Sequence, residues 1–177
     1  MENLYQAHER GVRLITLTWN YPNEIGYPNH EWTHQHQGLT GFGRDLVAEM
    51  NRLGMIVDVS HLSDQGFYDV AQFSDRPFVA SHSNARTITG HSRNLTDEMI
   101  RLLAEKGGIT GLNFCHAFLG DDPDTSRIQD MVRHIRHIVK VGGIEAMALG
   151  TDFDGIKSQL EIEHMGQIGK LLQALEQ

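Results

Sequence analysis

The sequence has little cysteine, no long hydrophobic run and no apolar leader. Its single cysteine, Cys115, cannot form a disulfide within the chain, and this fits a reducing compartment such as the cytoplasm. The longest apolar stretches have only the length of a strand, and residues 1–10 lack the apolar segment of a signal peptide. We therefore expect a soluble cytoplasmic protein that has no membrane partner.

Basic residues are also scarce. The chain carries 15 lysines and arginines against 23 aspartates and glutamates, which gives a formal net charge of −8, and no basic run occurs. Binding to a nucleic-acid backbone needs a dense basic surface. The composition therefore excludes nucleic acid as the expected partner.

The chain does have enough apolar material for one hydrophobic core. It contains 177 residues, of which 40% are hydrophobic, and this predicts a single domain over residues 1–177. It also contains 11 histidines, the one compositional feature that points to metal chemistry.

Short apolar runs alternate with amphipathic segments along the whole sequence. The apolar runs predict strands at residues 12–18, 55–59, 78–81, 109–114 and 146–150. Helical spacing and capping residues predict helices at residues 42–53, 63–73, 96–105 and 128–141, and from Leu160 to the end. This alternation indicates βαβ units and a parallel sheet.

Two α/β architectures have such a sheet. A doubly wound sheet is complete with these strands, but the sequence after the first strand lacks the glycine-rich dinucleotide fingerprint that would favour it. A (β/α)8 TIM barrel typically needs about 250 residues. We therefore expect a partial barrel of the metal-dependent hydrolase type, with about five of the eight β-α units present.

Three predicted strands end on residues that can bind a metal or move a proton, namely His61, His82 and Asp152. The carboxyl ends of parallel strands lie on one face, so these side chains are expected to converge there. Neutral imidazole is a common zinc ligand, and a catalytic zinc usually has three protein ligands and an open water position. These residues together suggest a hydrolytic metal site. For each histidine, the alternative hypothesis is a structural role in which the ring hydrogen-bonds under a loop.

Two further roles follow from the same strand-end rule. Asp152 can transfer a proton beside a metal, or it can cap the turn that follows at Gly155. Arg93 lies in the loop after His82 and can hold a substrate carboxylate through two parallel hydrogen bonds, or it can be a solvated loop arginine. The sequence leaves both alternatives open.

Other chemically active side chains have simpler interpretations. The spacing of three histidines in one loop fits no zinc motif, and a mobile solvated loop is expected for His30, His34 and His36. Cys115 has no acidic or oxyanion pattern around it and is expected to be an inert thiol.

Several motifs, taken in order, resemble the renal or membrane dipeptidase family of zinc peptidases, particularly its soluble bacterial members. The motifs are GVRLITLTWN, GLTGFGRDLVAEMNRLGMIVDVSHLSD, PFVASHSNAR, HSRNLTDEMI, AEKGGITGLNF and ALGTDFDGI. The resemblance implies a metal-dependent hydrolase barrel with a pair of zinc ions that cleaves dipeptides, including those with a C-terminal D-residue. It also implies that His61 and His82 bind one zinc, that Asp152 transfers protons and that Arg93 holds the substrate carboxylate.

The sequence departs from the family pattern in two respects. The family's His-x-Asp pair and bridging glutamate have no counterpart here, so we expect a chain truncated at both ends that binds one zinc ion or none. Trp19 stands where mammalian relatives place a substrate-contacting histidine, which makes Trp19 a candidate substrate contact.

The leading functional hypothesis is metal-dependent hydrolysis of a dipeptide substrate. One alternative is a non-catalytic barrel fragment that serves as an interaction module, because unpaired sheet edges favour association, including homo-oligomer formation. Another alternative is a different metal-dependent amidohydrolase, such as a lactonase or phosphoesterase.

Overall fold

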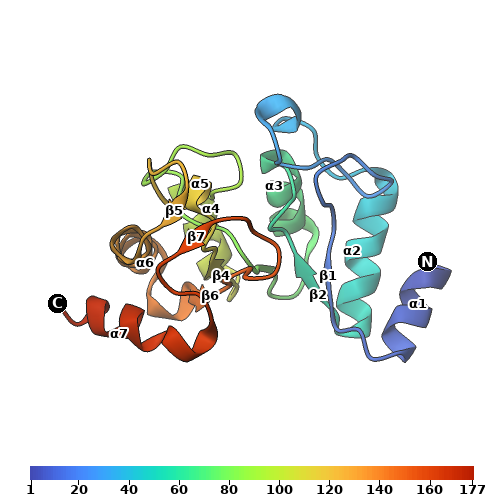
Figure 1. Ribbon diagram of the computed structural model, residues 1–177. Helices are drawn as coiled ribbons and strands as arrows, with labels where there is room; N and C mark the ends of the chain where they lie inside the picture. Colours follow the sequence, from blue (N-terminus) through green and yellow to red (C-terminus); the bar gives the residue numbers. More distant parts are fainter. The chain divides into compact units, whose positions relative to one another are not determined.

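The computed structural model describes residues 1–177 and divides the chain into two compact units (Figure 1). The first unit comprises Met1–Ala80 and Glu105–Gly108, and the second comprises Ser81–Ala104 and Ile109–Gln177.

The first unit is built on three parallel strands. Its elements are α1 (Glu2–Glu9), β1 (Leu14–Thr16), the 3-10 turn η1 (Trp32–His34), α2 (Gly41–Leu53), β2 (Ile56–Asp58), α3 (Asp64–Phe73) and β3 (Val79–Ala80). In the parallel register Ile15 lies opposite Val57, and Asp58 lies opposite Val79. Helices α2 and α3 pack against each other beside these strands (Figure 1).

Capping residues set the ends of α2 and α3. The Thr40 hydroxyl accepts a hydrogen bond from the Gly43 amide at 3.0 Å, and the Ser63 hydroxyl accepts one from the Gly66 amide at 3.1 Å. Gly54 ends α2 with a φ of 69°, a conformation that glycine adopts without steric cost. The structure thus confirms the predicted start of α3 and the predicted end of α2.

The second unit contains two separate parallel strand pairs. Its elements are α4 (Asp97–Glu105), β4 (Ile109–Leu112), α5 (His116–Leu119), β5 (Thr125–Ser126), α6 (Ile128–Gly142), the 3-10 turn η2 (Ile144–Ala146), β6 (Met147–Leu149), β7 (Gln159–Leu160), the 3-10 turn η3 (Met165–Gln167) and α7 (Gly169–Leu175). Strand β4 pairs with β6, and β5 pairs with β7. Helix α6 packs on α7.

Each unit has an apolar interior. In the first unit the fully buried side chains include Met50, Val57 and Phe67. The second unit has a continuous core cluster of Leu112, Phe114, Leu119, Met131, Val132, Ile135, Ile162 and Leu171. Burying an aliphatic or aromatic side chain of this size contributes about 1.5–3 kcal/mol, so these interiors hold the strand ends in place.

The prediction of a helix from Leu160 onward is wrong. Leu160 lies in β7 opposite Ser126 of β5, and the final helix begins only at Gly169. The backbone of this segment hydrogen-bonds to a strand distant in sequence, a pairing that local helical periodicity does not reveal. Helix α1, at the amino end, was also not predicted.

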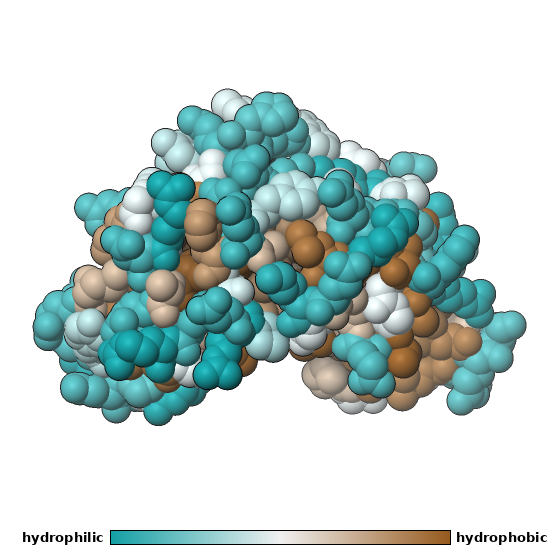
Figure 2. All heavy atoms as spheres, turned by 180° about the vertical axis from the view of Figure 1, so that it is seen from behind, coloured by the Kyte–Doolittle hydropathy of each residue, from teal (hydrophilic) through white to brown (hydrophobic).

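Parallel strands joined by helices confirm the α/β class, and the arrangement is consistent with part of a barrel. The number of barrel units and the single-domain assignment stay predictions. None of the helices combines the length and the apolar character needed to cross a membrane. Figure 2 shows a face that is mostly hydrophilic with some apolar patches, and the most exposed large apolar residues of the chain are Tyr21, Trp19 and Ile144.

Candidate functional site

His61 follows β2 in the first unit, and its backbone is held on two sides. Its carbonyl oxygen accepts hydrogen bonds from the Thr18 hydroxyl at 2.8 Å and from the Asn29 amide at 2.9 Å. Ring atom Nδ1 lies 3.2 Å from the amide oxygen of Asn20. An amide oxygen only accepts, so Nδ1 carries the proton and Nε2 carries the lone pair, which is the tautomer that metal-ligating histidines commonly use.

A buried carboxylate shapes the turn that leads to His61. Asp58 is fully buried, and its oxygens accept hydrogen bonds from the Thr16 hydroxyl at 2.7 Å, the Ser60 hydroxyl at 2.7 Å and the Ser60 amide at 3.1 Å. These donors offset the cost of burying the charge. Asp58 therefore stabilises the end of β2, a role that the sequence analysis missed.

Trp19 lies between Thr18 and Asn20 at the end of the first strand, and 67% of its surface is exposed. An exposed aromatic ring at this position can contact a molecule that approaches from solvent. Its predicted substrate contact stays a prediction.

His82 belongs to the second unit and begins the loop after β3. Its Nδ1 lies 2.7 Å from the hydroxyl oxygen of Ser81. The Ser81 carbonyl lies against Gly111 in β4 and Gly150 after β6, where a Cβ atom on either glycine would overlap the oxygen. These glycines therefore let the chain that carries His82 approach the strand ends closely.

Asp152 has a positive φ of 61° and is the only non-glycine residue with such a backbone. Its carbonyl oxygen, rather than its side chain, accepts the hydrogen bond from the Gly155 amide at 2.9 Å that closes the turn. Its carboxylate instead accepts a hydrogen bond from the Asn113 side-chain amide at 3.2 Å. Its carboxylate also lies over Gly155, so the proton-transfer role and the structural role at this turn both stay predictions.

Arg93 is buried, with only 3% of its surface exposed, so the solvated-loop alternative is wrong. Its guanidinium carbon lies 5.4 Å from the centre of the Phe118 ring, and the His91 ring lies 4.6 Å from the same centre. The Arg93 amide donates a hydrogen bond to Nδ1 of His91 at 3.1 Å. The cation therefore rests on an aromatic surface, where the attraction of the π face increases with desolvation.

The Arg93 loop is fixed by buried polar residues that the sequence analysis did not single out. The Asn94 side-chain amide donates to the carbonyl oxygens of Phe118 and Thr89, both at 2.9 Å. His134 of α6 is fully buried, and burial lowers its pKa to about 4. Its Nδ1 accepts from the Ala85 amide at 3.1 Å. The imidazole is thus a neutral structural group.

The loops that carry His82, Arg93 and Asp152 meet in one hydrogen-bond network of the second unit. The Asn84 side-chain amide donates to the carbonyl oxygens of Asn113 at 3.0 Å and Phe118 at 3.3 Å. His61 and Trp19 belong to the first unit. The strand-end rule that marked His82 also applies to Asn113, which directly follows β4, and could have found it.

Other candidates do not form a reactive centre. Burial raises the pKa of the Cys115 thiol above its ordinary value, which agrees with an inert thiol. Neither unit contains a group of three or more His, Cys, Asp or Glu side chains placed to hold a metal ion, and this includes the loop of His30, His34 and His36. The two strand-end histidines fit zinc by their nitrogen chemistry, but they are fewer than the three ligands of a catalytic site.

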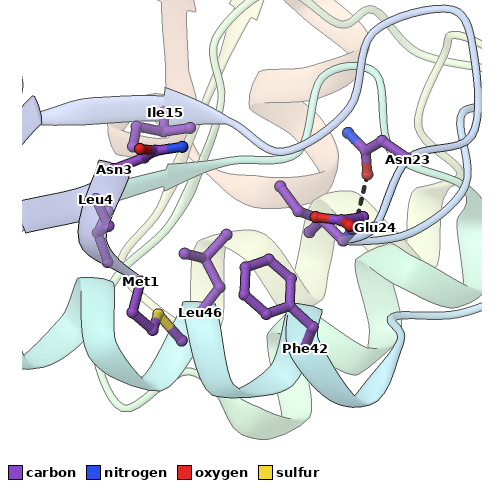
Figure 3. Close-up of a pocket in the computed structure, with 9 residues that line it drawn as sticks. Met1, Asn3, Leu4, Ile15, Asn23, Glu24, Phe42 and Leu46 are labelled. Carbon is purple, nitrogen blue, oxygen red and sulfur yellow. Dashed lines mark hydrogen bonds between the residues drawn. The ribbon is translucent and has the colours of Figure 1, made fainter.

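A hollow of about 490 Å³ lies in the first unit (Figure 3). Its apolar lining comes from α1, β1 and α2 and includes Leu4, Ile15, Phe42 and Leu46. None of the predicted site residues lines it.

Comparison with known proteins extends these observations. The family model described as membrane dipeptidase (peptidase family M19) matches residues 1–177. An uncharacterized dipeptidase of Schizosaccharomyces pombe is 40% identical over 156 residues, which cover 86% of this chain and 38% of that protein. An uncharacterized protein of the pqqA 5′ region of Klebsiella pneumoniae is 36% identical over 182 residues. The matched region covers 98% of this chain and 66% of that protein.

One similar solved structure is a metallopeptidase from Rhodobacter sphaeroides liganded with a phosphinate mimic of the dipeptide L-Ala-D-Ala. Its identity is 34%, its TM-score is 0.90, and the match covers 99% of this chain and 52% of that chain. This chain therefore spans about half the length of that solved relative.

Proposed function

Because the chain belongs to the membrane dipeptidase family, peptidase family M19, we propose that the protein of which it is part hydrolyses dipeptides with zinc. The proposed substrates include dipeptides with a C-terminal D-residue. The observation that carries this proposal is the 34% identity, over 99% of this chain, to the Rhodobacter sphaeroides metallopeptidase liganded with a mimic of L-Ala-D-Ala. A phosphinate is tetrahedral, as is the transition state of peptide hydrolysis, and enzymes bind such mimics tightly.

His61 and His82 are the proposed ligands of one zinc ion. The support for this role is their position after β2 and β3 and the oxygen atoms beside each Nδ1. A bound zinc ion supplies Lewis-acid polarisation of the scissile carbonyl and activation of a water molecule. We propose that the complete protein adds the remaining ligands and completes the (β/α)8 barrel, in which residues 1–177 form part of a single domain.

Arg93 is the proposed anchor for the substrate carboxylate. A guanidinium binds a carboxylate through two parallel hydrogen bonds, and its burial on Phe118 strengthens this contact because less water competes. Trp19 is proposed to contact the substrate from the exposed end of β1.

Asp152 is the proposed proton carrier. A carboxylate at this position takes a proton from the attacking water and transfers it to the leaving amine nitrogen, so that the amine departs in neutral form. Its strained backbone and its hydrogen bond to Asn113 support a carboxylate held in one orientation. Location in the cytoplasm and assembly of a homo-oligomer stay predictions.

The proposal can be tested with the complete product of the gene, purified and loaded with zinc. Hydrolysis of Ala–D-Ala and of Ala–L-Ala is measured beside a lactone and a phosphotriester. We expect cleavage of both dipeptides and little turnover of the other two substrates. Absence of dipeptide cleavage by a zinc-loaded protein would refute the proposal. Turnover of only the lactone or the phosphotriester would favour the alternative hypothesis of a different metal-dependent amidohydrolase.

A further inference from the structure

Asn113 is a fully buried amide at the carboxyl end of β4, and its backbone is tied to the loop of His82. Its amide nitrogen donates to the Asn84 side-chain oxygen at 2.8 Å, and its carbonyl oxygen accepts from the Asn84 side-chain nitrogen at 3.0 Å. This reciprocal pair holds Asn113 in place whatever its own side chain contacts.

The orientation of the Asn113 side chain is determined by its two neighbours. Its oxygen accepts a hydrogen bond from the Cys115 amide at 2.7 Å, and its nitrogen donates to the Asp152 carboxylate at 3.2 Å. A flipped amide would place the nitrogen against the Cys115 N–H and the oxygen against the carboxylate, and both contacts would be repulsive. The Asn113 side chain therefore presents a donor to Asp152.

Asp152 itself has little freedom to choose another position. Its φ of 61° is an unusual backbone conformation for a residue with a side chain, and its carboxylate lies over Gly155, where a Cβ atom would overlap it. The backbone aims the carboxylate, and the Asn113 nitrogen holds one of its two oxygens. The other oxygen lies beside the backbone at Gly155, so both carboxylate oxygens have fixed positions.

We propose that Asn113 is a positioning residue for the proton transfer assigned to Asp152, and that Asn84 couples this pair to the loop of His82. This inference rests on the proposed function, because it requires Asp152 to act in turnover. Asn113 does not itself touch the substrate. Its contribution is to keep the carboxylate in a single orientation through a charge-assisted hydrogen bond.

The test compares N113A with N113D in the complete, zinc-loaded protein. Alanine removes the donor, whereas aspartate keeps the size of the side chain and the acceptor for the Cys115 amide but places an anion against Asp152. If Asn113 positions the carboxylate, kcat decreases by about 10-fold or more in N113A. The kcat of N113D is lower still, and KM and zinc content stay close to those of the unchanged protein in both variants.

A purely structural role predicts that kcat, melting temperature and zinc content fall together, because a cavity or a second buried carboxylate then acts through the fold. Such a parallel loss, or an unchanged kcat in N113A, would overturn the inference. N51A is the matched control, because Asn51 is also buried and its side-chain nitrogen donates to the Ser74 hydroxyl at 3.1 Å in the first unit. We expect N51A to lower the melting temperature while kcat is retained.

The same substitutions in a D152N background separate this inference from the proposed function. With Asp152 neutralised, N113A and N113D should no longer differ in residual turnover, measured at high enzyme concentration. Full turnover by D152N alone would refute the proton-transfer role of Asp152. Low turnover by D152N, together with unchanged turnover by N113A and N113D, would refute only the role of Asn113.

Discussion

The backbone amide of Ala85 donates a hydrogen bond to Nδ1 of His134 over 3.1 Å. This bond requires an unprotonated Nδ1, and Nε2 in turn donates to the Leu119 carbonyl oxygen at 2.9 Å. The buried imidazole therefore joins the loop after His82 to the segment after β4 only in its neutral form.

Acid should weaken the fold through His134. Burial lowers its pKa from 6.5 to about 4. The unfolded chain therefore binds the proton more readily, and stability that is complete above pH 6.5 is lost as the pH falls towards 4. The loss in free energy of unfolding is at most about 3 kcal/mol. Urea denaturation at a series of pH values measures it.

H134Q is the matched variant for this experiment, because glutamine can accept from Ala85 and donate to Leu119 but does not titrate. We expect the advantage of the unchanged protein over H134Q to shrink as the pH falls. The Asp97 carboxylate, whose pKa is lowered by its hydrogen bond with His137, adds acid sensitivity to both proteins and cancels in the comparison. An advantage that does not vary with pH would contradict the prediction.

Replacing either proposed zinc ligand should lower metal content. We expect H61A and H82A, each in the complete protein, to bind less zinc after dialysis, as measured by atomic emission. H36A is the control, because His36 lies exposed in the loop that follows η1 and should not change the zinc content. Full zinc retention by H61A or H82A would show that the residue is not a ligand.

Replacing Arg93 by lysine should impair substrate binding even though the charge is kept. Lysine lacks the planar fork that binds a carboxylate through two bonds and that stacks on Phe118. We expect KM for a dipeptide to rise by about 10-fold or more, with a smaller change in kcat. For the corresponding dipeptide amide, which has no carboxylate, R93K and the unchanged protein should differ little. An equal loss on both substrates would argue against a carboxylate anchor.

Adding one methyl group at Gly150 should disturb the chain that carries His82. A Cβ atom there would overlap the Ser81 carbonyl oxygen, which is backbone and cannot rotate away. We expect G150A to lose about 1–3 kcal/mol of stability and to bind zinc more weakly. G169A is the control, because Gly169 is the first residue of α7 and a Cβ atom there meets no atom within 4 Å. A stable G150A variant with normal zinc content would contradict the prediction.

Much of the framework could be predicted from local sequence. Short apolar runs next to turn and capping residues marked β1, β2, β3, β4 and β6, because strands of a covered parallel sheet are rich in apolar residues. The short strands β5 and β7 were not predicted, because neither lies in an apolar run and each is defined only by its pairing with the other. The prediction of a helix at Leu160 was wrong because this residue pairs with Ser126, which is distant in sequence.

The sequence by itself determined the α/β class, the family and the strand-end positions of His61, His82 and Asp152, because these depend on residue order and on local hydrophobic periodicity. The tertiary structure alone decided the surroundings of Arg93 and Asp152, and it excluded a solvated loop position for Arg93. Burial of the guanidinium on Phe118 and the hydrogen bond from Asn113 to the carboxylate join residues that are 25 and 39 positions apart. Such contacts form only when folding brings separate strand ends together, and no local pattern encodes them.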